Sequence, residues 1–343
     1  MIAVATLTLL VACSTSERPI DLSPVVPGSP PPGTPAARQG DEIMVCGKLI
    51  HTGAPVVLWN DPGGYDAYRV TRRFDPSETR PSRPERGADT PNRYGIRPVD
   101  ALTAEEKSAV ASRGWDIPEL AKVVRSFVIH YDVCGTSRQC FKILQDVRGL
   151  SVHFLLDLDG TIYQTLDLKE RARHSGPGND FSVGVEIAHI GAYSPDDPKE
   201  LKVLSDWFKR DDDGRMRTIV PKWLGGNQSQ RTPNFTPRPS RDEIVAGTIH
   251  GRKYVQYDFT EEQYRSLSRL TAALCATFPE MKADVPRNDD GSVRADALTP
   301  AELAKWGGLI GHWHLTSSKS DPGPAFDWNR LLHAVRALLN RPS

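Results

Sequence analysis

The residues best suited to chemistry lie close together near the C-terminal end of the chain. His312, Lys319 and Asp321 place an imidazole, an ammonium and a carboxylate within ten residues. The apolar pair Leu309-Ile310 precedes them and reads as the end of a strand, and the Gly and Pro residues that follow favour a fixed loop. A strand that ends in such a loop can aim several side chains at one point.

A second strand is predicted far upstream, at 127–130, and it also delivers a histidine, His130, at its polar end. Two histidines and one carboxylate are the protein ligands of an open catalytic zinc site, which keeps one position for water or substrate. The set His130, His312 and Asp321 therefore predicts a zinc centre and a hydrolytic reaction. His314 could compete as a ligand, because residues two apart share a face of an extended segment.

Composition excludes one class of partner and bounds the folded part. The 343 residues carry 43 basic and 43 acidic side chains, so the chain has no overall positive field with which to hold nucleic acid. An apolar content of 38% is low and 28 prolines are many, which indicates folded regions diluted by tails and long loops. We expect no nucleic-acid partner and a monomeric protein.

The N-terminus predicts export and lipid attachment. Residues 2–12 are apolar but too few to span a bilayer as a mature helix. They lead into Cys13 in a pattern that resembles the lipobox of bacterial lipoproteins, so we interpret 1–13 as a signal peptide that ends at a lipidated Cys13. An ordinary secretory peptide is the alternative. Ser14 favours attachment to the outer membrane of the cell envelope, facing the periplasm.

Composition shifts divide the rest of the chain. Residues 14–40 are rich in Pro, Ser and Gly, and we expect a disordered tether that could extend roughly 80 Å at about 3.1 Å per residue. Residues 41–120 hold short apolar stretches, and we expect an accessory segment packed on the core. Residues 121–343 are predicted to form the catalytic domain, with a polar inserted loop at about 205–245.

Strand and helix patterns alternate along the predicted catalytic domain. The turn Asp159-Gly160 between two apolar runs predicts a hairpin, and 183–188 reads as a further strand. Thr260 opens a capping box before a long helix, and 328–339 is amphipathic. The alternation places the chain in the α/β class, with a central mixed β-sheet flanked by helices.

Four cysteines lie beyond the N-terminal segment. Cys134 and Cys140 directly follow the strand at 127–130, and we expect them to form a disulfide in an exported protein. Cys46 and Cys275 are the other possible intramolecular pair, and this pairing stays open. A cysteine hydrolase that uses Cys134 near His130 is a competing interpretation, which the disulfide would forbid.

Taken together, these blocks resemble the type-2 N-acetylmuramoyl-L-alanine amidases, which share their fold with peptidoglycan recognition proteins and phage lysozyme-like amidases. The resemblance covers about 125–192 and 250–340, with the blocks in the family's order. Those blocks are 127–130, 151–164, 173–176, 182–187 and 311–328.

The resemblance implies a zinc amidase that cleaves the amide bond between the lactyl group of N-acetylmuramic acid and L-alanine of the stem peptide. Its substrate would be peptidoglycan or muropeptides. The family pattern implies Zn²⁺ held by His130, His312 and Asp321. It further implies that Glu186 handles protons and that Lys319 stabilises the oxyanion.

The loop that contains His174 and Asn179 is predicted to contact substrate, and His153 is expected to pack behind the site. The spacing of Cys134 and Cys140 also resembles the disulfide of the recognition proteins. A non-catalytic peptidoglycan-binding module is the alternative function. The complete ligand set disfavours it, because binding modules of this kind usually lack one or more ligands.

Overall fold

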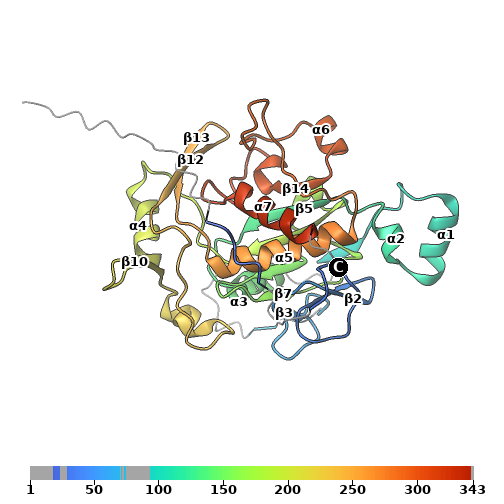
Figure 1. Ribbon diagram of the computed structural model, residues 1–343, viewed down its shortest axis with the longest axis horizontal. Coiled ribbons are helices and arrows are strands. Elements are labelled where there is room, and N and C mark those ends of the chain that lie inside the picture. Colours follow the sequence, from blue (N-terminus) through green and yellow to red (C-terminus); the bar gives the residue numbers. More distant parts are fainter. Residues whose placement is uncertain (1–17, 24–28, 70, 72, 75–92, 341–343) are drawn as a thin grey trace, which may run out of the picture.

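The computed structural model describes residues 18–23, 29–69, 71, 73–74 and 93–340. The predicted signal peptide, including Cys13, lies outside the described residues. At the centre stands a six-stranded sheet in the order β14-β5-β9-β6-β7-β3 (Figure 1). The bounds of these strands, in the same order, are Gly308–Gly311, Ser126–Tyr131, Ser182–Ile187, Phe154–Leu156, Ile162–Gln164 and Val56–Leu58.

The sheet is mixed. β14, β5, β9 and β6 are parallel to one another. β7 is antiparallel to β6, and β3 is parallel to β7. The predicted α/β class with a central mixed sheet is therefore confirmed.

Four two-stranded sheets surround the centre. The first pairs β1 (Glu42–Val45) with β2 (Lys48–His51), and the second pairs β4 (Tyr94–Ile96) with β8 (Glu170–Ala172). The third pairs β10 (Phe208–Arg210) with β11 (Met216–Thr218), and the fourth pairs β12 (Val245–Ile249) with β13 (Arg252–Gln256). The α-helices α1 to α7 are Ala104–Arg113, Ile117–Leu120, Ser137–Lys142, Pro198–Trp207, Glu261–Thr277, Pro300–Lys305 and Trp328–Leu339. α3 continues directly as a π-helical segment, Ile143–Arg148.

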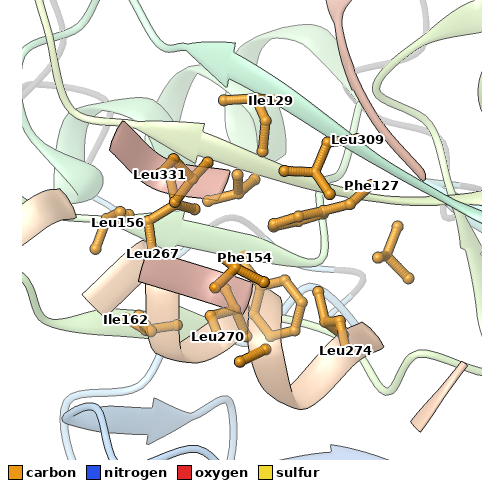
Figure 2. Packing of buried hydrophobic residues seen from close by; sticks show 14 of the residues in the cluster. Phe127, Ile129, Phe154, Leu156, Ile162, Leu267, Leu270, Leu274, Leu309 and Leu331 are labelled. Atoms are coloured by element: carbon orange, nitrogen blue, oxygen red, sulfur yellow. The ribbon is translucent and has the colours of Figure 1, made fainter. Parts of the chain in front are cut away.

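The main core lies between the sheet and the helices α5 and α7, which pack side by side across one face (Figure 1). Phe127 and Ile129 of β5 point into this core, as do Phe154 and Leu156 of β6. In Figure 2 they meet leucines of α5 and α7. Because strand side chains alternate between faces, Val128 and His130 of β5 point to the opposite face.

The opposite face of the sheet is covered by α3 and the π-helical segment. Leu155 of β6 packs there with Cys140, Phe141 and Leu144 in a separate buried cluster. The two faces thus have different uses. One is filled by apolar side chains from the long helices, and the other is only partly covered and leaves room for polar side chains at the strand ends.

The hairpin predicted at Asp159-Gly160 joins β6 and β7. Gly160 has φ +80°, and a Cβ there would stand 2.7 Å from the Glu262 carbonyl oxygen of α5. Glycine therefore serves both the turn and the close approach of the helix.

The predicted tether is corrected over part of its length. Ile20 is buried in the main core, and the backbone carbonyl of Arg18 accepts a hydrogen bond of 2.8 Å from Arg330 Nε. Residues 29–40 also lie on the fold, because the Gly33 N–H donates to the His51 carbonyl. Composition alone concealed these anchors, since a proline-rich segment can still bury single apolar side chains. Residues 14–17 and 24–28 lie outside the described residues.

Two other segments differ from their expected form. Residues 41–120 contribute β3 to the central sheet, so part of this segment is integral to the core rather than accessory. The segment 205–245 is more than an inserted loop, because it holds the β10–β11 pair. Its Trp207 and Met216 are also buried in an apolar cluster shared with Leu158 and Ile190. Among the described helices, none combines the length and the apolar character needed to cross a membrane.

The cap of α5 gives a test of the fold. Thr260 Oγ1 accepts from the Gln263 N–H and also donates to the Leu158 carbonyl, and the residue is buried. Thr260→Val should lower the free energy of unfolding by about 1–3 kcal/mol, because both partners lose a buried hydrogen bond. Thr299→Val, at the exposed capping box of α6, is the matched control and should cost less. Equal losses in chemical denaturation would contradict this role of Thr260.

Candidate active site

Strand pairing brings the first two candidate residues together. His130 of β5 and Glu186 of β9 are directly opposed in the parallel register, so their side chains leave the sheet on the same face. Both stand near the C-terminal ends of their strands. Gly311, the last residue of β14, pairs with Ile129, which places His312 immediately beyond the sheet edge and beside His130.

The three predicted zinc ligands converge. His130 Nδ1 lies 3.0 Å from His312 Nδ1 and 2.8 Å from Asp321 Oδ2, and His312 Nδ1 lies 3.0 Å from the same oxygen. All three residues are buried. In a tetrahedral zinc site with bonds of about 2.0–2.2 Å, the donor atoms are about 3.3–3.6 Å apart, so these atoms need to separate by less than about 1 Å to fit the ion.

The electrostatics of the three residues also suit a cation. Burial, and after it the charge on His312, lowers the pKa of His130 to about 4, so His130 is neutral at pH 7. Burial alone would raise the pKa of Asp321, but the charge of His312 and hydrogen bonds from both histidines hold it below its ordinary value. A neutral imidazole and a carboxylate are the forms that bind metal.

Gln256, at the end of β13, secures the loop that carries Asp321. Gln256 of β13 donates from Nε2 to the Pro322 carbonyl at 3.1 Å and accepts from the Ala325 N–H at 3.0 Å. A Cβ at Gly323 would stand 2.1 Å from Gln256 Oε1, so the loop lies tightly on this amide. No local pattern in the sequence indicated this contact, because its partners lie more than sixty residues apart.

A cavity of about 280 Å³ opens over the three ligands. Its wall includes Glu186, whose Oε2 is buried and has no hydrogen-bond partner among the described residues. Burial raises the pKa of Glu186 well above its ordinary value, and the negative charge of Asp321 adds to this shift. A buried, unpaired carboxyl is costly in a purely structural role, so its place in the cavity wall indicates a chemical one.

Lys319 stands at the rim of the cavity and is exposed. Its positive charge affects both His130 and Glu186. It contributes to lowering the pKa of His130, and it opposes the rise in the pKa of Glu186. The ammonium is thus close enough to interact with charge that develops inside the cavity.

His174, predicted to bind substrate, lines the cavity and also supports a ligand. Its Nδ1 lies 3.1 Å from His130 Nε2, on the side of that ring away from Asp321. This contact leaves His130 Nδ1 for the metal and fixes the orientation of the ring. Gly184 makes it possible, since a Cβ there would stand 2.4 Å from the His174 ring. Sequence reasoning did not foresee this supporting role.

Asn179 does not line this cavity. Its Oδ1 accepts hydrogen bonds from the N–H groups of His174 and Ser175 and from Ser175 Oγ, so it shapes the loop that positions His174. Direct contact between Asn179 and substrate stays a prediction, and this geometry gives it no support.

The remaining histidines of the region are structural. His314 Nδ1 accepts from the Gly311 N–H and its Nε2 lies 2.8 Å from the Arg294 carbonyl, so both ring nitrogens are engaged away from the three ligands. His153 is fully buried behind His174, as expected for a packed residue.

The expected disulfide is not formed in this structure. Cys134 and Cys140 lie next to one another in the cavity wall, but both are free thiols, as are Cys46 and Cys275. The cysteine-hydrolase interpretation also lacks support, because the ring nitrogens of His130 face other histidines and Asp321 rather than Cys134.

Comparison with known proteins agrees with this geometry. Residues 120–212 match the model of the N-acetylmuramoyl-L-alanine amidase family. The match covers about a quarter of the chain. The matched amidase segment contains His130, His174 and Glu186 and ends before His312 and Asp321, whose assignment rests on the distances above. The match supports an amidase enzyme in general and peptidoglycan as its class of substrate.

Among solved structures, the crystal structure of the selenomethionine derivative of AmpD is similar to this chain. The two share 17% sequence identity, and the alignment covers 73% of this chain and 91% of the other with a TM-score of 0.32. No curated protein matches the chain.

The amidase-site geometry predicts that His312 is essential for metal binding. His312→Ala should lose stoichiometric zinc, since a buried ligand is removed from a three-residue set. Metal content after dialysis measures this, in a Cys134→Ser background that keeps the cavity thiols from binding the ion. His333→Ala, exposed on α7, is the control and should retain one zinc. A full equivalent of zinc in His312→Ala would refute the assignment.

The contact between His174 and His130 yields a second prediction. His174→Leu removes the partner of His130 Nε2 and should weaken zinc binding about 10–100-fold, while His174→Gln, which can still accept a hydrogen bond, should recover part of the loss. Competition with a chelator measures the affinity. Unchanged affinity in His174→Leu would show that the contact does not orient the ligand.

Proposed function

We propose that this chain is a zinc-dependent N-acetylmuramoyl-L-alanine amidase that separates the lactyl group of N-acetylmuramic acid from L-alanine of the stem peptide. One observation carries the proposal. His130, His312 and Asp321 present three donor atoms within 3.0 Å of one another, in a cavity that also exposes the unpaired carboxyl of Glu186. The family match over 120–212 supports the reaction class.

Zinc, when bound, supplies a Lewis acid that lowers the pKa of water to about 7 and polarises a carbonyl. The chain contributes the rest. Burial keeps His130 neutral and the histidines keep Asp321 ionised, so the ligands are ready to bind without first losing protons. His174 holds the His130 ring in place through its far nitrogen.

We assign the proton transfer to Glu186. Its free oxygen accepts the proton of the attacking water, and the protonated carboxyl then donates it to the departing L-alanine amine. The raised pKa of Glu186 favours the first half of this transfer, because a more basic carboxylate accepts a proton more readily.

Lys319 is placed to stabilise the negative charge that forms on the carbonyl oxygen during attack. A well-placed donor of this kind contributes about 3–4 kcal/mol. The cavity of about 280 Å³ is smaller than a whole muropeptide, so the glycan and most of the stem peptide must lie outside it along the surface.

A non-catalytic binding module is the second candidate, and no observation favours it. Binding of peptidoglycan alone would not require three converging ligands or a buried carboxyl without a partner. The test is to incubate the zinc-loaded full chain with defined muropeptides and to look by mass spectrometry for a stem peptide with a free L-alanine amine. Release that stops with a chelator supports the amidase, and binding without release supports the module.

We also propose that Cys13 carries a lipid that holds the protein at the outer membrane, facing the periplasm. The support is the sequence alone. Since Arg18 and Ile20 are anchored on the fold, five residues separate Cys13 from the first anchor, which at about 3.5 Å each span about 18 Å rather than 80 Å. Incorporation of labelled palmitate, absent in Cys13→Ala, is the expected result; equal labelling of both proteins would contradict it.

Glu186→Gln tests the proton transfer. The amide keeps the shape of the side chain but cannot accept the proton, so kcat should fall about 10²–10⁴-fold while zinc content is unchanged. Glu105→Gln, exposed on α1, is the control and should match the unmodified protein. Substantial turnover in Glu186→Gln would assign the proton transfer to another group.

Lys319→Met tests the oxyanion role. Removal of the ammonium should depress kcat about 10²–10³-fold and change KM little, since the interaction forms only in the transition state. Lys305→Met, exposed on α6, controls for the loss of one surface charge. A rise in KM with unchanged kcat would instead mean that Lys319 binds substrate.

A further inference from the structure

A second group of metal-binding side chains lies in the wall of the same cavity. Asp132, Cys134 and Cys140 each offer one ligand atom, and these three atoms lie within 4.8 Å of one another. None of the three belongs to the set formed by His130, His312 and Asp321. The proposed amidase mechanism gives no role to either thiol.

The turn after β5 holds this group in shape. Asp132 Oδ1 accepts hydrogen bonds of 2.9 Å from the N–H groups of both Cys134 and Gly135, and a third of 3.1 Å from the His189 N–H. Val133 and Gly135 both have positive φ, which turns the chain sharply. Trp207 lies against the turn so closely that a Cβ at Gly135 would be 2.3 Å from its ring.

The other cysteine comes from the helix that follows. Thr136 caps α3 by accepting from the Gln139 N–H, and Cys140 stands one turn further on, 2% exposed. Asp132 Oδ2 is buried and has no hydrogen-bond partner among the described residues. A fixed carboxylate with one oxygen bound to the backbone and the other unpaired is suited to accept a cation.

The donor set defines the kind of cation. Two thiol sulfurs with one carboxylate oxygen favour soft or borderline ions such as Zn²⁺, Cd²⁺ or Cu⁺ over Mg²⁺ or Ca²⁺. In a tetrahedral zinc site with Zn–S bonds of about 2.3 Å, neighbouring donors are about 3.5–3.8 Å apart, which is within the observed limit. The fourth position would face the cavity.

We propose that Asp132, Cys134 and Cys140 form a second metal site, for a thiophilic cation, beside the histidine site. Binding of a divalent ion replaces the two thiol protons, so one ion enters and two protons are released to the solvent. The bound ion would link the turn after β5 to α3, and residues of both segments line the cavity. This inference does not depend on the amidase activity.

The same two sulfurs could instead join as a disulfide, so the full chain is first titrated with Cd²⁺ without any reductant. A band that appears only after reduction would show a disulfide and overturn the proposal. The full chain is stripped with a chelator, reduced with a phosphine and titrated with Cd²⁺ while the thiolate-to-cadmium charge-transfer absorption is followed. The band should saturate at one ion per chain, with two protons released per ion. The histidine site adds no such band, because it contains no sulfur.

Variants assign the band to its residues. Cys134→Ser and Cys140→Ser should each abolish it, Asp132→Asn should keep it with affinity lowered at least about tenfold, and Cys46→Ser and Cys275→Ser should leave it unchanged. A reduced protein without the band, a disulfide that the phosphine does not open, or a band that survives both cavity substitutions would overturn the proposal.

Cys140 is buried, so its variant needs a check of folding by circular dichroism. If it does not fold, Cys134→Ser decides, since that residue is only half-buried. X-ray absorption at the cadmium edge of the unmodified chain adds an independent count. Two sulfur neighbours in the band-forming species support the site, and one or none refutes it.

Discussion

The parallel register of β14, β5 and β9 is the constraint on which the site depends. It sets Ile129 opposite Gly311 and His130 opposite Glu186, so that two ligands and a carboxyl from distant parts of the chain reach one point. A slip of one residue would turn His130 into the apolar core and Phe127 or Ile129 into the cavity. The packing of α5 and α7 on the other face opposes this slip, because a slipped strand would bury polar side chains such as His130 against these apolar helices.

Burial of the site has a cost that the surrounding side chains offset. His130, His312 and Asp321 are removed from water, and each gains polar partners from the other two, while His130 also gains His174. Gln256 secures the loop of Asp321, and Asn179 secures the loop of His174. Glu186 keeps an unpaired buried oxygen in the cavity wall, so this unfavourable group lies next to the three ligands.

Local patterns in the sequence allowed part of this to be predicted. Apolar runs that end in His130 and His312 located the ligands, and a capping box located the start of α5, because these signals involve neighbours in the chain. The rest depends on long-range contacts. The membership of 56–58 in the central sheet and the burial of Ile20 are decided by partners more than a hundred residues away, and nothing in their immediate sequence reveals those partners.

The central claim is that three side chains hold one zinc ion next to Glu186. Crystals of the full chain loaded with one equivalent of zinc, measured at the zinc absorption edge, test it most directly. The account predicts an anomalous peak about 2 Å from His130 Nδ1, His312 Nδ1 and Asp321 Oδ2, with the fourth side open toward Glu186. A peak elsewhere, or imidazoles turned away from one another, would contradict it.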